Sequence, residues 1–143
     1  GTPFTVTTTA LDVNFDAFSE TRPVILDPSI LGNSVNHPLT SRDALPRSAF
    51  RTLTTSDANT PTVGRNTFFL DGVKTVDFSI NKSFAMPWEG QKLWLRADLF
   101  NAFNHVQYGF PSSSIANTNF GAITGVATLY SPRSIQVSLR YQY

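Results

Sequence analysis

The last ten residues constrain this chain most, because their side chains alternate strictly between apolar and polar. The segment reads S-I-Q-V-S-L-R-Y-Q-Y from Ser134 to Tyr143. A period of two places successive side chains on opposite faces of an extended strand, so the segment is predicted to be a β-strand with one apolar face. A tilted strand of about this length can also cross a lipid bilayer.

The same alternation recurs in three further segments. Residues 76–86 and 91–103 predict two more long strands, and residues 4–9 predict a shorter one. Lys82 falls on the apolar face of the first segment, where its aliphatic stem can lie along apolar surface and lift the charge toward an interface. Residues 121–127 are compatible with one more short strand. The prediction is an all-β antiparallel meander of about four long strands.

The connections between these strands are unequal in length. Pro87-Trp88-Glu89-Gly90 predicts a tight turn, whereas residues 10–72 and 104–133 are long and polar. Compact soluble domains rarely contain such long loops. Bacterial outer-membrane barrels have short turns on the periplasmic side and long loops outside. The asymmetry therefore favours a membrane β-barrel whose last strand ends on the periplasmic side.

Composition excludes several classes of protein. No apolar run approaches the ~18 residues of a membrane-spanning helix. The formal net charge of +1 gives no electrostatic support to nucleic-acid binding. The sequence has no Cys, which excludes disulfides and thiolate chemistry and fits an oxidising envelope compartment. It begins at Gly1 without a signal peptide, so we expect either a processed protein or a fragment.

No combination of residues indicates catalysis or a bound cofactor. His37 and His105 lie in different loops and have no ligand at metal-binding spacing. Ser112, Ser113 and Ser114 lack the G-x-S-x-G context of a nucleophilic serine. We therefore expect neither an enzyme nor a protein with a metal or cofactor.

Several motifs carry a family resemblance. They read T-V-D-F-S-I-N-K-S-F at 75–84, L-R-A-D-L-F-N-A-F-N-H at 95–105, N-F-G-A-I-T at 119–124 and S-P-R-S-I-Q-V-S-L-R-Y-Q-Y at 131–143. Their order resembles the C-terminus of Oar-like TonB-dependent receptors, the family with a carboxypeptidase-regulatory-like domain near its start. The resemblance implies a barrel of about 22 strands that holds a plug. Residues 1–143 would then be a C-terminal fragment in the bacterial outer membrane, without the plug and the other strands.

The resemblance also implies partners. These are the outer-membrane lipid, the rest of the barrel and plug, and the TonB complex, which acts through the absent plug. Outer-membrane proteins of this kind end in an aromatic residue that the barrel assembly machinery reads. The matching assembly signal is Ile135, Val137, Leu139, Tyr141 and Tyr143. The alternative is an ordinary amphipathic last strand of a soluble sheet.

The two faces of such a barrel predict different roles. The lumen-facing charges would be Asp77, Arg96, Asp98 and Arg140. They could form charge pairs or touch the plug, but we favour solvated wall charges without a ligand role. The aromatic residues Phe84 and Trp88, with Tyr141 and Tyr143, would gather at the periplasmic interface, where amphipathic rings are stable. Ordinary sheet packing is the alternative for these rings.

The sequence thus favours part of a TonB-dependent transporter barrel with an unidentified substrate. A secreted soluble β-sandwich that acts in binding or adhesion is the second interpretation, since its strands would alternate in the same way. A passive porin is the third. In a sandwich the apolar faces pack against a second sheet, whereas in a barrel they face lipid.

Overall fold

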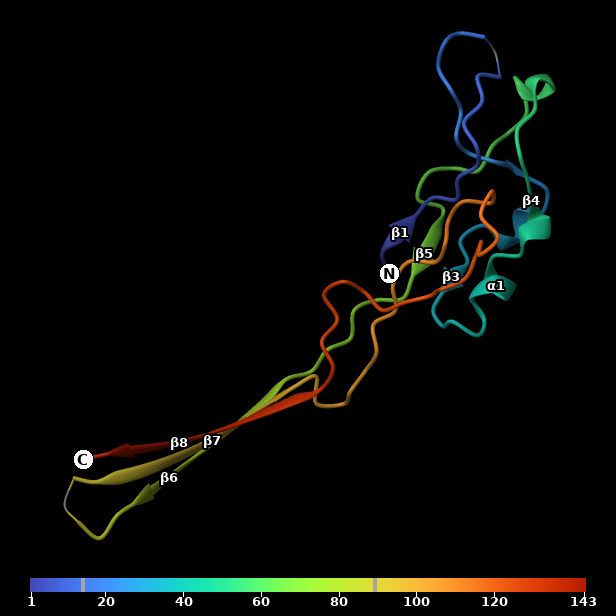
Figure 1. Cartoon of the computed structure of the whole chain (residues 1–143). Coiled ribbons are helices and arrows are strands. Elements are labelled where there is room, and N and C mark those ends of the chain that lie inside the picture. Colours follow the sequence, from blue (N-terminus) through green and yellow to red (C-terminus); the bar gives the residue numbers. More distant parts are fainter. Residues whose placement is uncertain (14, 89) are drawn as a thin grey trace. The chain divides into compact units, whose positions relative to one another are not determined.

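The computed structural model describes residues 1–13, 15–88 and 90–143, and it divides into two compact units (Figure 1). We call Lys74–Gln107 with Leu129–Tyr143 the sheet unit. Gly1–Val73 with Tyr108–Thr128 form the loop unit, since they contain most of the residues predicted as long loops.

The sheet unit is built on three long antiparallel strands in the order β6-β7-β8. These are β6 (Phe78–Ala85), β7 (Lys92–Phe100) and β8 (Ser134–Gln142). They confirm the three predicted long strands, each slightly shorter than predicted. The turn between β6 and β7 is closed by hydrogen bonds from Met86 N to Gln91 O (3.1 Å) and from Gln91 N to Trp88 O (3.2 Å). Glu89, which the predicted turn includes, lies outside the described residues.

The loop unit contains short elements only. One small sheet has the order β1-β5-β3, with β3 and β5 parallel, and β2 pairs with β4. The strands are β1 (Pro3–Phe4), β2 (Val24–Ile25), β3 (Ser34–Val35), β4 (Phe50–Arg51) and β5 (Phe68–Leu70). The helical turns are η1 (Pro28–Ile30), α1 (Ser41–Ala44), η2 (Arg47–Ala49) and η3 (Thr55–Asp57).

The segments predicted as open polar loops enclose a hydrophobic core. Phe68 is fully buried, and its ring lies 6.0 Å from the rings of both Phe4 and Phe50. The second segment contributes Phe120, whose ring packs edge-on against Phe50 at 5.5 Å, and buried Ile115. Buried apolar side chains from both segments stabilise the unit, so it is a folded structure and not a set of unconnected loops.

The predicted strand at residues 4–9 is the main error. Phe4, Val6 and Thr8 do alternate with more exposed neighbours, but their buried face points into the core of the loop unit. Only β1 is a strand there, and it pairs with β5, not with β6. The described residues therefore contain three long strands instead of about four. Alternation indicates that one face is buried, but it does not specify what covers that face.

The short strand with which residues 121–127 are compatible is also absent from the described part of the chain. Val126 forms an isolated bridge with Tyr108 instead. Gly121 has a φ of +75°, and a Cβ at this position would lie 3.0 Å from the Leu45 carbonyl oxygen. The segment needs glycine because only glycine tolerates both this backbone conformation and this close approach.

Candidate functional site

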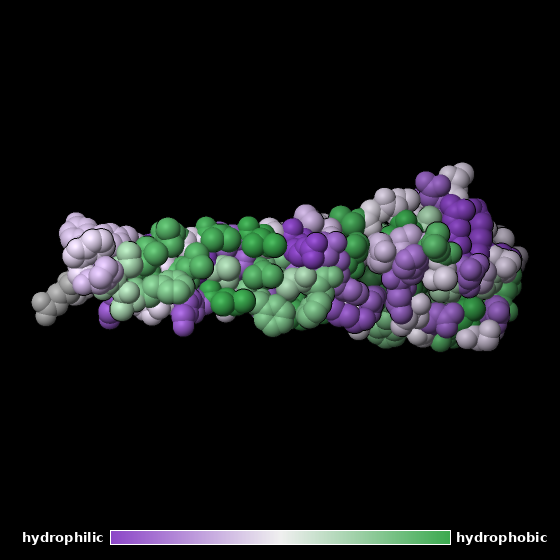
Figure 2. All heavy atoms as spheres, turned by 90° about the horizontal axis from the view of Figure 1, so that it is seen from below, coloured by the Kyte–Doolittle hydropathy of each residue, from purple (hydrophilic) through white to green (hydrophobic). Residues whose placement is uncertain are grey.

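The three long strands bring their apolar side chains into register. Phe78, Leu99 and Ile135 lie side by side across the sheet, and the same pairing continues along it. The remaining rows are Ile80–Ala97–Val137, Lys82–Leu95–Leu139 and Phe84–Leu93–Tyr141. Most of these side chains are exposed, with Val137 64% and Leu139 66% accessible, whereas Leu93, Ala97 and Leu99 on the central strand are half-buried. Figure 2 shows hydrophobic side chains gathered along this sheet, so the sheet presents an apolar surface that Lys82 interrupts.

The opposite face of the sheet carries most of its polar side chains, together with Trp94 and Phe100. Arg96 and Asp98, two residues apart on β7, form an ion pair (2.7 Å). Asp98 also accepts a hydrogen bond from the Ser79 hydroxyl on β6 (2.7 Å). An apolar face and a polar face on one sheet suit a boundary between hydrocarbon and water.

The structure does not gather the four charged residues predicted to face a lumen. Asp77 precedes β6 and accepts a hydrogen bond from Asn101 N at one end of the sheet (2.8 Å). Arg96 and Asp98 are paired within β7. Arg140 lies opposite Trp94, toward the other end. Arg96, Asp98 and Arg140 do share one face, but which solvent this face meets stays a prediction.

The predicted interfacial aromatics lie at the short-turn end of the sheet. Phe84 and Tyr141 are both opposite Leu93, so they belong to one row of the apolar face. The Tyr141 hydroxyl donates a hydrogen bond to Gln91, and its ring lies 6.4 Å from that of Tyr143. Trp88, in the turn itself, is 62% exposed. The arrangement agrees with an aromatic group at a membrane boundary, although a role in assembly remains a prediction.

The junction at the opposite end of the sheet was not predicted from the sequence. Asn101 follows β7 directly, is only 5% exposed and has a φ of +48°. Its side-chain amide donates to the carbonyls of His105 (3.2 Å) and Ser131 (3.0 Å), and its side-chain oxygen accepts from His105 N (2.9 Å). Asn101 therefore connects the end of β7 to the segment that leads into β8. The only sequence signal was an Asn that interrupts the apolar face.

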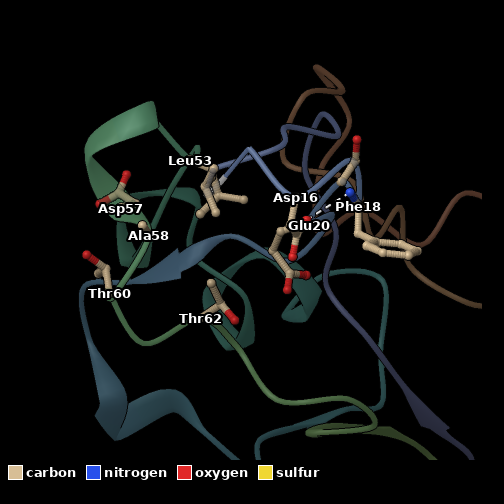
Figure 3. Close-up of a pocket in the computed structure, with 10 residues that line it drawn as sticks. Asp16, Phe18, Glu20, Leu53, Asp57, Ala58, Thr60 and Thr62 are labelled. Carbon is tan, nitrogen blue, oxygen red and sulfur yellow. Dashed lines mark hydrogen bonds between the residues drawn. The ribbon is translucent and has the colours of Figure 1, made fainter.

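The loop unit contains a polar pocket of about 350 Å³ between residues 16–20, with Val13, and residues 53–62 (Figure 3). Its walls carry three carboxylates, from Asp16, Glu20 and Asp57. Hydroxyl groups and short apolar side chains complete the lining. The hydroxyl groups belong to Ser19, Thr60 and Thr62, and the apolar side chains are Val13, Leu53 and Ala58. The ring of Phe18 also lines the pocket.

Arginines hold two of these carboxylates in place. The Arg22 guanidinium lowers the pKa of Glu20 to about 2, against the opposing effect of burial, and pairs with it at 2.9 Å. The Arg51 guanidinium, with help from Thr54, holds the pKa of the buried Asp57 far below its usual range. Asp57 also accepts hydrogen bonds from Thr54 N (2.8 Å) and the Thr54 hydroxyl (2.7 Å), which closes a capping box around η3. Both carboxylates are ionised at neutral pH and already paired.

The described residues offer no metal centre. No group of three or more His, Asp or Glu side chains in this part of the chain could hold a metal ion. His37 packs edge-on against Tyr108 at 5.4 Å in the loop unit, whereas His105 belongs to the sheet unit. None of the helices within these residues is both long and apolar enough to pass through a bilayer. Ser112, Ser113 and Ser114 form part of the loop-unit framework, where Thr7 N donates to Ser113 O (2.8 Å).

The comparisons with known proteins identify the family. A family model described as an outer membrane beta barrel domain matches residues 1–136, which contain the whole loop unit and the sheet unit as far as the start of β8. No curated protein and no solved structure matches the chain. The match agrees with the apolar and polar faces of the β6-β7-β8 sheet, and it confirms the predicted location. The chain belongs to the outer membrane beta barrel domain family and is located in the bacterial outer membrane.

Proposed function

We propose that the chain forms part of the barrel wall of a TonB-dependent transporter, which takes up an unidentified substrate. The observation that carries the membrane part of this proposal is the exposed apolar face of β6, β7 and β8. A soluble sandwich would bury Val137 and Leu139 against a second sheet, whereas here both side chains are mostly exposed. The finer assignment to TonB-dependent transport rests on the resemblance of the C-terminal motifs.

In this proposal the sheet has a defined orientation. The chain enters the sheet at Phe78 and leaves β7 at Phe100, at the end opposite the short turn. Short turns lie on the periplasmic side of such barrels, and long connections lie outside. The loop unit would therefore meet the external medium and make first contact with the substrate. The backbone N–H and C=O groups at the outer edges of β6 and β8 would form hydrogen bonds with neighbouring strands of the closed barrel.

Adjacent residues of β8 provide the test of membrane orientation. Val137 and Ser138 point to opposite faces, and the chain has no Cys, so each substitution Val137→Cys or Ser138→Cys introduces the only thiol of this sequence. In intact outer membranes, a water-soluble maleimide should label Ser138→Cys and leave Val137→Cys unlabelled. Both should react after solubilisation and denaturation, which is the control. Equal labelling of both positions in intact membranes contradicts a barrel wall.

Ion conductance separates a transporter from a passive porin. A porin barrel encloses an open aqueous channel, whereas the largest transporters have a plugged lumen. The purified parent protein, with its plug, should therefore conduct little in a planar bilayer until urea displaces the plug. A large stable conductance without urea would favour the porin.

A further inference from the structure

One cation interrupts the apolar face of the β6-β7-β8 sheet. Lys82 on β6 lies directly opposite Leu95 on β7, in the same row as Leu139 on β8. Its neighbours along β6 on this face are Ile80 and Phe84, because every second side chain of a strand points to the same side. The sheet therefore offers only apolar neighbours to the Lys82 ammonium group.

The described residues supply no anion to this ammonium group. Lys82 is exposed, and no ion pair joins it to a carboxylate within residues 1–13, 15–88 and 90–143. A lysine on the lipid-facing wall of a barrel is strongly destabilising at the bilayer midplane and much less so near either interface. The ammonium group should therefore reach an interface and meet an anion that lies outside this chain.

The position of Lys82 along β6 indicates which interface it reaches. One row, that of Phe84 and Tyr141, separates it from the short turn, whereas the rows of Ile80 and Phe78 separate it from the other end of the strand. Two residues of strand rise roughly 7 Å, which is about 5 Å of bilayer depth at the usual tilt of barrel strands. The flexible four-carbon stem of a lysine can cover a step of this size while its charge leaves the hydrocarbon.

We propose that Lys82 binds the headgroup phosphate of a phospholipid in the periplasmic leaflet of the outer membrane. The inference rests on the proposed function, which turns the apolar face toward lipid and the short turn toward the periplasm. The ammonium group pairs with the phosphate as a point charge. The rings of Phe84 and Tyr141 lie at the level of the headgroup, and the acyl chains run along the apolar rows beyond Lys82.

The surroundings of Lys82 favour a phospholipid over other anions. A dissolved phosphate ion would have to leave water to reach an ammonium group among apolar side chains, whereas a lipid phosphate is already held at the bilayer surface. A carboxylate from a neighbouring strand of the barrel would itself point into hydrocarbon, where its charge is strongly unfavourable. A phospholipid supplies the anion and covers the apolar side chains at the same time.

Lipid binding to the purified parent protein tests the proposal. Native mass spectrometry during a titration with phosphatidylglycerol measures the dissociation constant of the bound lipid. Lys82→Gln should weaken this binding about fivefold, the contribution of one lysine close to an anionic membrane surface. Lys82→Arg should keep the affinity because it keeps the charge. Lys92→Gln is the matched control and should leave the affinity unchanged, since Lys92 lies at the same end of the sheet on the opposite face.

Cross-linking in phosphatidylglycerol vesicles tests the direction in which the lysine extends. A photoreactive phenylalanine at Phe84, on the short-turn side of Lys82, should attach to the headgroup region of the lipid. The same residue at Ile80, on the other side, should attach to an acyl chain, and fragmentation of the cross-linked product distinguishes the two. Lys82→Gln should lower the headgroup yield at Phe84. A headgroup cross-link at Ile80 and not at Phe84 would overturn the assignment to the periplasmic leaflet.

The outcomes separate this site from the proposed function. The phosphate site is overturned by an affinity for phosphatidylglycerol that Lys82→Gln leaves unchanged, or by displacement of the lipid with excess inorganic phosphate. Either result can occur while Val137→Cys stays unlabelled in intact membranes, in which case the barrel wall stands. Labelling of Val137→Cys would instead overturn the orientation of the sheet. If Lys82→Gln fails to assemble, Lys82→Met, which removes the charge and keeps a long unbranched side chain, takes its place.

Discussion

Asn101 is a buried polar side chain whose hydrogen bonds are all satisfied locally. It adopts a left-handed backbone conformation, which Asn tolerates better than most residues because its short side chain can hydrogen-bond nearby. The side chain then bonds to both His105 and the segment before β8 through Ser131. One residue therefore ends β7 and fixes the start of the return path.

Replacement of Asn101 should show this dual role. Asn101→Ala loses three side-chain hydrogen bonds and leaves a non-glycine residue at positive φ, so we expect a loss of about 2–4 kcal/mol in unfolding free energy. The loss for Asn101→Gly should be about 1 kcal/mol smaller than that for Asn101→Ala, because glycine tolerates the positive φ. Urea unfolding of the membrane-assembled protein measures both. Equal losses for the two variants would contradict the conformational part of the argument.

The Glu20–Arg22 ion pair predicts a pH response of the loop unit. The pKa of Glu20 is lowered from 4.5 to about 2 in the folded state, so folding favours the ionised form. The stabilisation is therefore fully present above pH 4.5 and is lost as the pH falls from 4.5 through about 2. Amide exchange at Thr21 and Arg22, whose N–H groups donate to Glu20, should accelerate over this window beyond the intrinsic pH effect. Glu20→Gln should remove the extra response.

At the scale of elements, β8 shows how the two faces of one strand differ. Val137 belongs to the apolar row with Ile80 and Ala97, whereas Ser138 is opposite Arg96 on the polar face. Both residues are exposed in this chain, so burial does not separate their roles. Their roles differ because each face is expected to meet a different solvent. The transfer of a charge from water into hydrocarbon is strongly unfavourable in free energy.

The pair Val137→Arg and Ser138→Arg measures this difference. Near the bilayer midplane, an arginine on the lipid face costs about 2–4 kcal/mol. We therefore expect Val137→Arg to destabilise the folded barrel by this amount and Ser138→Arg to have a small effect. The measurement is equilibrium unfolding in lipid vesicles. A larger loss for Ser138→Arg would reverse the assignment of the two faces.

At the scale of the whole molecule, the chain divides into two units with different kinds of stability. The loop unit has its own buried core around Phe68, Phe50 and Phe4. The sheet unit has strand pairing but leaves its apolar face exposed. We therefore expect the loop unit to depend on internal packing and the sheet unit to depend on lipid and on neighbouring strands.

Phe68→Ala tests this separation. Phe68 is fully buried, so truncation should cost the loop unit about 3–5 kcal/mol through lost transfer energy and a cavity. Proteolysis should then cut residues 1–73 earlier, while β6, β7 and β8 remain protected in the membrane. Phe103→Ala is the control in the sheet unit, since Phe103 is 72% exposed and its ring forms a T-shaped pair with that of Phe78. Simultaneous loss of protection in both units would show that they fold as one.

The sequence alone determined the long strands and their two faces, because a period of two is a local property of extended backbone. It also determined the short turn, and its motifs carried the resemblance to outer-membrane receptors. Tertiary structure decided what covers each apolar face. Val6 and Val137 alternate in the same way, yet one is buried in a protein core and the other is exposed on the sheet. Burial depends on residues distant in sequence, such as Phe68 and Phe120, and local alternation carries no information about them.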